Sequence, residues 1–193
     1  MHRDDRRRAL PRPRPRAHAA AGRPAAGPII SDTLFLTSPT TTARDRAALD
    51  DLAARAGLDA AAFAGELFRA RSDFSRTTPR ELVATNLKRY EFGGAALAIG
   101  QAETLATDYF LAHKGDFLAE LRRLKDDEHA DYALFLATDI LHGSSTALYP
   151  GPDERRLVAT AFPGSAPGPD AADLPGVVSR KKQVVPPLAR ALG

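Results

Sequence analysis

A run of three cations near the C-terminus is the strongest candidate for a binding site in the sequence. Arg180, Lys181 and Lys182 follow Ser179, a residue type typical of helix N-caps. The helix dipole disfavours positive charge at that end by about 0.3 to 1 kcal/mol per cation. A bound anion would reverse this effect, because backbone N–H groups, an arginine fork and lysine ammonium groups can all donate to a phosphate. The cluster therefore predicts a phosphate-binding site.

Two pairs of valines bear on the alternative, a basic patch that is only solvated. Val177-Val178 and Val184-Val185 flank the three cations and are apolar enough to be buried. A solvated patch rarely lies between two buried pairs, so the valines favour the phosphate site.

Two aspartates are weaker candidates. Asp32 and Asp139 each follow an apolar run that predicts a strand. A carboxylate at a strand end is well placed to bind a metal or ligand in an α/β sheet, whereas a single aspartate also fits a turn or a cap. Both interpretations stay open on these residues alone. His113, His129 and His142 lack the spacing of metal ligands and are predicted to lie at the surface.

The composition excludes several classes of protein. With 193 residues the chain is long enough for one domain with a proper core. It has no cysteine, which excludes disulfide scaffolds, zinc–thiolate sites and iron–sulfur clusters and fits a reducing cytoplasm, the expected location. No apolar run approaches the roughly 18 residues that a membrane span needs, so we expect no membrane partner.

The positive charge is concentrated at the N-terminus. Of the formal net charge of +3, residues 1–28 carry +6, from eight arginines and two aspartates, and the other 165 residues carry −3. This Arg-, Pro- and Ala-rich arm has no apolar face and is predicted to be disordered. It lacks the apolar core of a secretory signal, and no aromatic side chain interleaves its arginines to stack on a base. Nucleic acid is therefore not an expected partner.

The hydrophobic pattern predicts an α/β fold with a mixed β-sheet flanked by helices. Thr42 and Gly57 are expected to begin and end one helix, and Thr78 with Glu81 forms a capping box at the start of another. The expected strands are 29–36, 88–92, 95–103, 132–138 and 145–149. The expected helices are 43–56, a helix that begins at Asp59, and 78–86, 106–127 and 153–162, the last capped by Asp153; residues 163–173 are expected to form a loop.

The sequence SRKKQVVPPL at 179–188, preceded by LPGVV, resembles the C-terminal signature of the manganese-dependent (family II) inorganic pyrophosphatases of the DHH phosphoesterase superfamily. Further segments appear in the order that the family shows: ISDTLF at 30–35, SPT at 38–40, IGQ at 99–101 with Glu103, and TDIL at 138–141. The resemblance covers about residues 29–190. It implies that a disordered arm (1–28) precedes a remnant of the DHH domain and a helical connection (29–60), followed by a DHH-associated type 2 substrate-binding domain (61–191).

The resemblance also implies roles for individual residues. Asp32 matches the aspartate that ligates the metal pair, Arg180 and Lys181 match the two cations that hold pyrophosphate, and Lys88 matches a lysine that also reaches the substrate. The implied activity is that of a hydrolase, which converts pyrophosphate to two phosphates with manganese, cobalt or magnesium as cofactor.

The departures from the family matter as much. The other metal ligands of the family, including its Asp-His-His motif, have no counterpart in this sequence, and residues 94–97 lack the lysines expected in the hairpin. We therefore expect a truncated C-terminal portion that is inactive, or nearly so, alone. The alternatives are a non-catalytic phosphate- or polyphosphate-binding module, a partner of a separate DHH domain or a homo-oligomer, an exopolyphosphatase-like hydrolase, and a gene fragment or a misassigned start.

Overall fold

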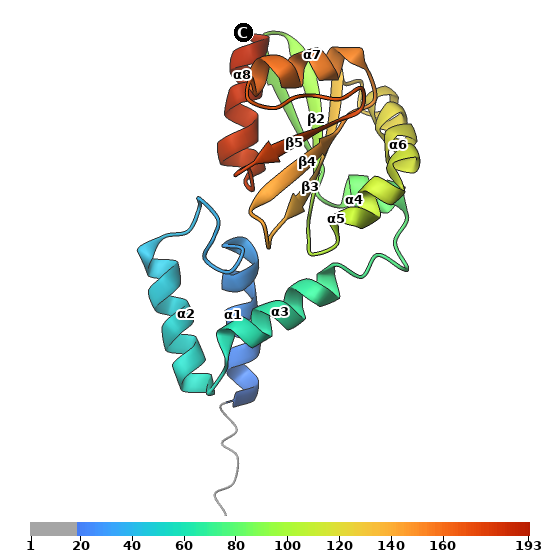
Figure 1. Cartoon of the computed structure of the whole chain (residues 1–193). Helices are drawn as coiled ribbons and strands as arrows, with labels where there is room; N and C mark the ends of the chain where they lie inside the picture. The colour runs from blue at the N-terminus through green and yellow to red at the C-terminus, as the bar shows by residue number, and fades with distance from the viewer. Residues whose placement is uncertain (1–18) are drawn as a thin grey trace, which may run out of the picture.

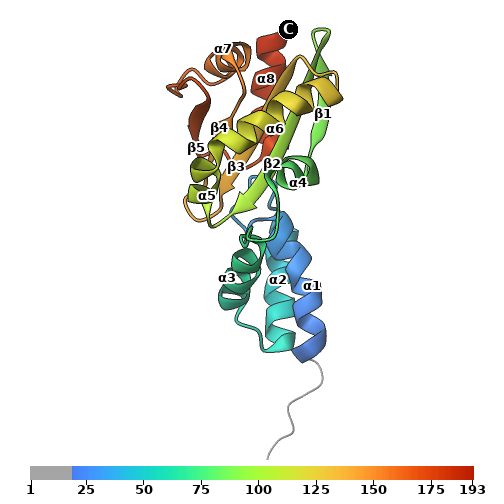
Figure 2. The same ribbon diagram turned by 90° about the vertical axis from the view of Figure 1, so that its right-hand side faces the viewer.

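The computed structural model describes residues 19–193, with side chains from residue 25 onward. Three helices, α1 (Ala19–Asp32), α2 (Ala43–Ala56) and α3 (Ala60–Arg71), form a bundle below a five-stranded sheet (Figure 1). The bundle meets the sheet at one end of its strands (Figure 2). No helix of this part of the chain is long and apolar enough to cross a bilayer.

The sheet is mixed, as predicted, and its strands lie in the order of the chain. β1 (Lys88–Phe92) pairs antiparallel with β2 (Ala95–Thr104), and β2 pairs parallel with β3 (Tyr132–Asp139). The sheet continues with β4 (Ser144–Leu148) and β5 (Ala171–Pro175), both antiparallel to their neighbours. Because β2 and β3 are parallel, the chain crosses over between them through helices, which must cover a face of the sheet.

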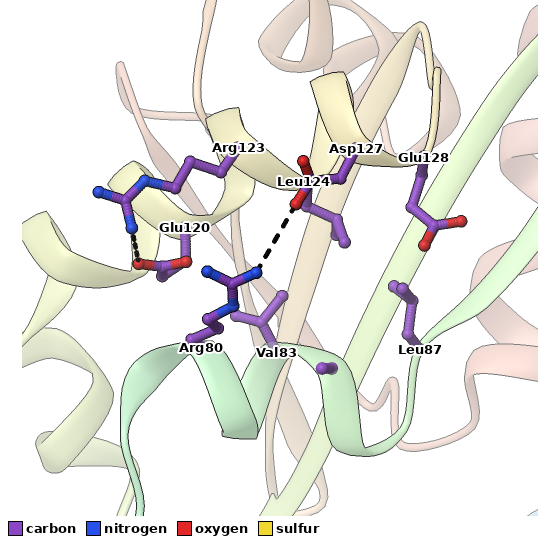
Figure 3. A pocket seen from close by; sticks show the side chains of 9 residues that line it. Arg80, Val83, Leu87, Glu120, Arg123, Leu124, Asp127 and Glu128 are labelled. Carbon is purple, nitrogen blue, oxygen red and sulfur yellow. Dashed lines mark hydrogen bonds and ion pairs between the residues drawn. The ribbon is translucent and has the colours of Figure 1, made fainter.

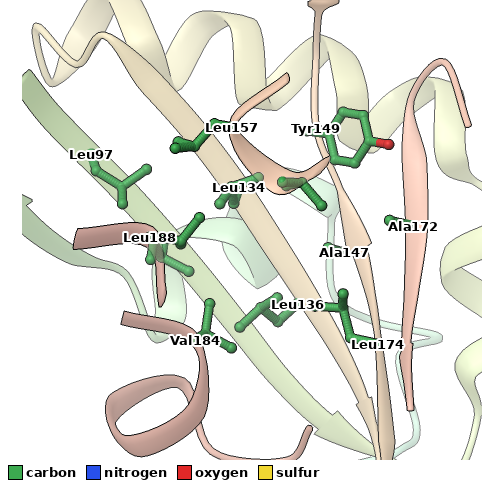
Figure 4. Packing of buried hydrophobic residues seen from close by; sticks show 12 residues of the cluster. Leu97, Leu134, Leu136, Ala147, Tyr149, Leu157, Ala172, Leu174, Val184 and Leu188 are labelled. Atoms are coloured by element: carbon green, nitrogen blue, oxygen red, sulfur yellow. The ribbon is translucent and has the colours of Figure 1, made fainter. Parts of the chain in front are cut away.

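The central strand β3 is buried on both faces, so its side chains alternate between two cores. Leu134 and Leu136 pack against Leu188 of α8 (Val185–Leu192) and Leu157 of α7 (Pro152–Ala161), which cover one face (Figure 4). Phe135 points to the opposite face.

The second face is covered by α4 (Pro79–Thr85), α5 (Thr107–Ala112) and α6 (Lys114–Asp127). Its core is aromatic: the ring centroids of Phe110, Phe117 and Phe135 lie 5.1 to 5.4 Å from one another. Offset and tilted rings at such distances stabilise one another beyond their apolar burial. The sheet is therefore held between two helical layers, as the predicted fold class requires.

The strand expected at 29–36 is wrong, because these residues end helix α1 and form the turn after it. Ala26, Ile30 and Leu34 recur at intervals of four and are buried against the rest of the bundle. That spacing marks one face of a helix. Pro28 lies exposed inside α1. The arm expected to be disordered through residue 28 is therefore helical from Ala19, and residues 1–18 lie outside the described residues.

The turn after α1 has an unusual backbone. Leu34, Phe35 and Leu36 all have positive φ angles, of 47°, 50° and 66°. This left-handed region costs a residue other than glycine about 1 to 2 kcal/mol. Backbone bonds from Phe35 N to the carbonyl of Ile30 (2.8 Å) and from Ser38 N to that of Thr33 (2.9 Å) hold the turn.

Several helix signals in the sequence are confirmed. Thr42 and Thr78 both form complete capping boxes, and Gly57 ends α2 with a φ of 59°. Two expectations are wrong. The helix expected at 106–127 is divided at His113 into α5 and α6, and α7 begins from Gly151 with no side-chain cap from Asp153.

Gly100 in β2 is required by the close approach of α4 to the sheet. A Cβ placed there would lie 2.9 Å from the Val83 carbonyl oxygen and 2.9 Å from Cδ2 of Phe135. Because one of these atoms belongs to the backbone of α4, the helix itself would have to move.

Gly100→Ala should therefore destabilise the chain by about 1 to 3 kcal/mol, the usual effect of overpacking a core. The free energy of unfolding, measured by urea titration, tests this. Gly115→Ala is the matched control, because nothing lies within 4 Å of a Cβ there. In α6 it should be neutral or stabilising by up to about 1 kcal/mol. Equal effects of the two substitutions would contradict the packing argument.

Candidate functional site

A cleft of about 360 Å³ opens where the bundle meets the sheet. It brings together all four residues that the sequence singled out, Asp32, Lys88, Arg180 and Lys181, although 148 positions separate the first from Arg180. The other residues that line it are Leu34, Ser38, Thr40, Asn86, Tyr90, Gln101, Glu103, Val178 and Ser179.

Each of the four comes from the end of an element. Asp32 is the last residue of α1, and Lys88 is the first of β1. Arg180 and Lys181 begin η1 (Arg180–Val184), a π-helical turn that leads into α8. Ser179 caps this turn, since its hydroxyl accepts a bond from Lys182 N at 3.3 Å. Single π-helical turns are rare and are frequent at functional sites.

The Arg180 guanidinium is 9% exposed and is held by three oxygens. Its Nη1 donates to the backbone carbonyls of Asn86 and of Ile99, the latter at 2.8 Å. Its Nη2 donates to Oδ1 of Asn86 at 3.0 Å. We call these three oxygens the arginine cradle. None of them carries a formal charge.

Burial lowers the pKa of Arg180 from its ordinary value, and the phenol of Tyr90 and the carboxylate of Glu103 oppose that shift. An arginine stays protonated in a protein in spite of such effects. The cleft therefore contains a positive charge that is partly desolvated, and an anion there would interact with it more strongly than with a cation in water.

The loop before Arg180 is held by buried side chains. Oε1 of Gln183 accepts bonds from the backbone N–H groups of Val178 and Ser179, both at 3.0 Å. Gln101 donates to the Val178 carbonyl at 3.2 Å, and Ser145 donates to that of Val177 at 2.7 Å. These bonds place the start of η1 at the end of β2.

The two lysines of the site differ from Arg180. Lys88 and Lys181 are exposed, and neither ammonium group forms a hydrogen bond or ion pair with residues 25–193. Lys182, the third cation of the cluster, points elsewhere: its Nζ donates to the Pro39 carbonyl at 2.9 Å and so joins η1 to the bundle.

The opposite side of the cleft is acidic. Nη2 of Arg71 lies 3.3 Å from Oε2 of Glu103, and its Nη1 donates to Oγ of Ser31 at 2.6 Å. Arg71 thereby ties the end of α1, where Asp32 lies, to β2. Burial raises the pKa of Glu103, Arg71 opposes this, and the charge of Asp32 adds to it.

The manganese pair that the resemblance implies does not fit the described residues. Asp32 is exposed and offers one carboxylate, whereas Glu103 is already bonded to Arg71. Within the described part of the chain, no group of three histidine, aspartate or glutamate side chains lies close enough to hold a metal ion. Those residues gather cations in one cleft but do not form a complete metal centre.

Asp139 is not part of the cleft lining and acts as a turn residue. Its Oδ1 accepts bonds from the backbone N–H groups of Leu141 and His142, both at 2.9 Å. This is the turn interpretation that the sequence left open. His113, His129 and His142 are exposed, as predicted.

Four further residues line the cleft for which the sequence predicts no role: Asn86, Tyr90, Ser38 and Gln101. Ser38 and Gln101 lie in segments that carry the family resemblance, so the sequence contained a signal that could have identified them as site residues. Asn86 stood out only as the end of a helix, and its contact with Arg180 joins residues 94 positions apart. No local pattern reports such a contact.

A second hollow, between α4 and α6, contains none of the predicted site residues (Figure 3). Four of its five charged side chains pair with one another: Arg123 with Glu120 at 2.8 Å and Arg80 with Asp127 at 3.9 Å. The fifth, Glu128, leaves the lining with a net negative charge, which does not suit an anion.

Comparison with family models matches residues 65–191 to the DHHA2 domain. A Clostridium acetobutylicum protein named "Probable manganese-dependent inorganic pyrophosphatase" is 37% identical over 164 residues, which are 85% of this chain and 52% of that protein. A protein of the same name from Lactobacillus delbrueckii subsp. bulgaricus is 39% identical over 165 residues, 84% of this chain and 52% of that protein.

A solved structure titled "Crystal structure of Methanococcus jannaschii putative family II inorganic pyrophosphatase" superposes with a TM-score of 0.75 at 36% identity, covering 85% of this chain and 53% of that one. The chain thus spans about half the length of the curated relatives it matches. Because the family model matches well over half of this sequence, across the sheet and the cations of the cleft, the chain belongs to the DHHA2 domain family.

Proposed function

We propose that this chain is the C-terminal, substrate-binding portion of a manganese-dependent inorganic pyrophosphatase, an enzyme that hydrolyses pyrophosphate to two phosphates. The observation that carries the proposal is the convergence of Lys88, Arg180 and Lys181 on one cleft of a DHHA2 domain. The names of the relatives, and the half of their length that this chain spans, support it.

The three cations have complementary parts in the proposed binding. Arg180 is fixed by its cradle and presents N–H groups in a rigid plane, which suits two oxygens of one phosphoryl group. Lys88 and Lys181 are mobile point charges that can follow the second phosphoryl group. Charge-assisted bonds of this kind contribute about 1.5 to 3 kcal/mol each.

Hydrolysis itself needs metal ligands from elsewhere. We propose that residues 29–60 are the end of a DHH domain and its helical connection, that residues 61–191 are the substrate-binding domain, and that Asp32 is one ligand of a metal site. A separate DHH domain would supply the remaining ligands, and the chain can also associate with a second copy of itself. We place the protein in the cytoplasm, which the absence of cysteine supports.

A non-catalytic module that binds pyrophosphate or short polyphosphate is the second candidate function. The poor fit of the described residues to a metal pair favours this candidate. The cleft has its cations, but within those residues it has no set of three metal-ligating side chains. Supplying the N-terminal half of a manganese-dependent relative separates the two candidates: restored hydrolysis supports the enzyme, and binding without restored hydrolysis supports the module.

Pyrophosphate should bind the full chain, as measured by isothermal titration calorimetry in metal-free buffer. Lys181→Ala should lower the affinity by about ten- to a hundredfold, because it removes one charge-assisted contact, and Arg180→Ala combined with Lys181→Ala should abolish binding. Arg190→Ala is the control, since Arg190 is exposed on α8 outside the cleft lining. If Arg190→Ala lowered the affinity equally, the effect would come from the overall charge of the chain and not from the cleft.

The purified chain should not hydrolyse pyrophosphate in the presence of Mn²⁺, because one free carboxylate cannot hold a pair of divalent cations against water. Release of phosphate, followed colorimetrically, checks this. Turnover at about 1 per second or faster, a rate typical of enzymes, would contradict the expectation of an incomplete site.

A further inference from the structure

The orientation of Arg180 depends on residues distant in sequence. Two of its acceptors belong to Asn86, which follows α4 as its C-cap, and the third is the carbonyl of Ile99 in β2. Three of the five N–H groups of the guanidinium are used in this cradle. The N–H of Nε and one N–H of Nη2 lie outside it, and Arg180 lines the cleft.

We propose that Asn86 is a positioning residue for anion binding: its side-chain amide fixes the plane of the Arg180 guanidinium so that the remaining N–H groups face the cleft. The inference rests on the proposed phosphate-binding function and extends it to a residue that acts through Arg180. The oxygen that Asn86 directs at the guanidinium is an acceptor, which a phosphate oxygen would avoid.

The side chain of Asn86 adds what the backbone carbonyls cannot. Both carbonyls accept from Nη1, so alone they hold one corner of the guanidinium. Oδ1 of Asn86 accepts from Nη2 and holds a second corner. Together with the covalent attachment at Nε, these two fixed corners define the plane of the guanidinium. A planar fork that is already ordered loses less entropy when it binds an anion.

The cradle also leaves the charge of Arg180 available. Its three acceptors are two peptide carbonyls and one amide, all formally neutral. An ordered arginine among neutral acceptors is oriented without being neutralised. A side-chain hydrogen bond also joins Arg180 to the phenol of Tyr90. The carboxylate of Glu103 influences Arg180 too, but it forms its own ion pair with Arg71.

The fold explains why Asn86 can reach Arg180. Gly100 allows α4 to approach β2, and α4 ends beside the carbonyl of Ile99. The antiparallel pairing of β1 with β2 begins at Lys88 opposite Ile99, two residues after Asn86. Asn86, the C-cap of α4, is therefore held next to β2, within reach of Arg180 at the start of η1.

Two measurements on the full 193-residue chain test the proposal. The first is independent of any ligand: NMR of the arginine side chains reports whether rotation of the Arg180 guanidinium is hindered, with Arg180→Ala assigning its signals. Wild type should show resolved, slowly exchanging Nη signals. Asn86→Ala should average them, whereas Asn86→Asp keeps an acceptor oxygen and should preserve them.

The second measurement is pyrophosphate affinity by calorimetry, in a double-mutant cycle. Asn86→Ala should lower the affinity about tenfold, the effect of losing one oriented charge-assisted bond. In an Arg180→Ala background the same substitution should change the affinity by less than about twofold, because the residue it orients is gone. Asn86→Asp should bind no more tightly than Asn86→Ala, because its carboxylate would neutralise Arg180 although it keeps the guanidinium ordered.

Thr85→Ala is the matched control at the same end of α4. Its hydroxyl donates to the Glu81 carbonyl at 2.6 Å and is not part of the cleft lining, so binding and NMR signals should both stay unchanged. Thermal unfolding of each variant separates loss of fold from loss of orientation.

The outcomes are distinguishable. Unchanged affinity of Asn86→Ala, an equal loss with and without Arg180, or resolved Nη signals in Asn86→Ala would each overturn the positioning role. A wild-type chain that does not bind pyrophosphate would overturn the proposed function instead, and the guanidinium signals would then still decide whether Asn86 orients Arg180.

Discussion

The burial of one cationic side chain, Arg180, is the constraint on which the site depends. A guanidinium removed from water costs several kcal/mol unless its N–H groups find acceptors. The acceptors come from Asn86 and Ile99, so α4, the start of β1 and the middle of β2 must converge at one point. Gly100 allows that convergence, and the Ser179 cap begins η1 beside it. The elements around this end of the sheet supply the acceptors that offset the cost of burying Arg180.

The cleft is a junction between two differently built parts of the chain. The α/β part supplies cations from η1 and β1, and the bundle supplies Asp32 from the end of α1. Polar contacts join the parts: Arg71 with Glu103, and Lys182 with the Pro39 carbonyl at 2.9 Å. Val178, next to the cations, also packs among the apolar residues of the bundle. The shape of the cleft therefore depends on how the bundle and the sheet meet.

Local signals predicted most of the elements, because their causes are local. The N-caps at Thr42 and Thr78 act within a few residues, and the helix starts that they predict are confirmed. The strand expected at 29–36 was wrong for the opposite reason. Short apolar runs suit strand and helix alike, and the choice was made by burial of Ile30 against the other helices. The division of the helix at His113 likewise had no clear local marker.

The sequence by itself determined the chemical character of the site: a run of cations after an N-cap, an excess of acid elsewhere outside the N-terminal arm, and motifs specific enough to indicate a family. Those properties reside in residue types and short spacings. Only the tertiary structure decided which cations share a cleft, that Lys182 turns to the bundle while Lys181 does not, and that Asn86 holds Arg180. These are contacts between residues far apart in the chain, and they exist only because the sheet, its helices and the bundle pack in one arrangement.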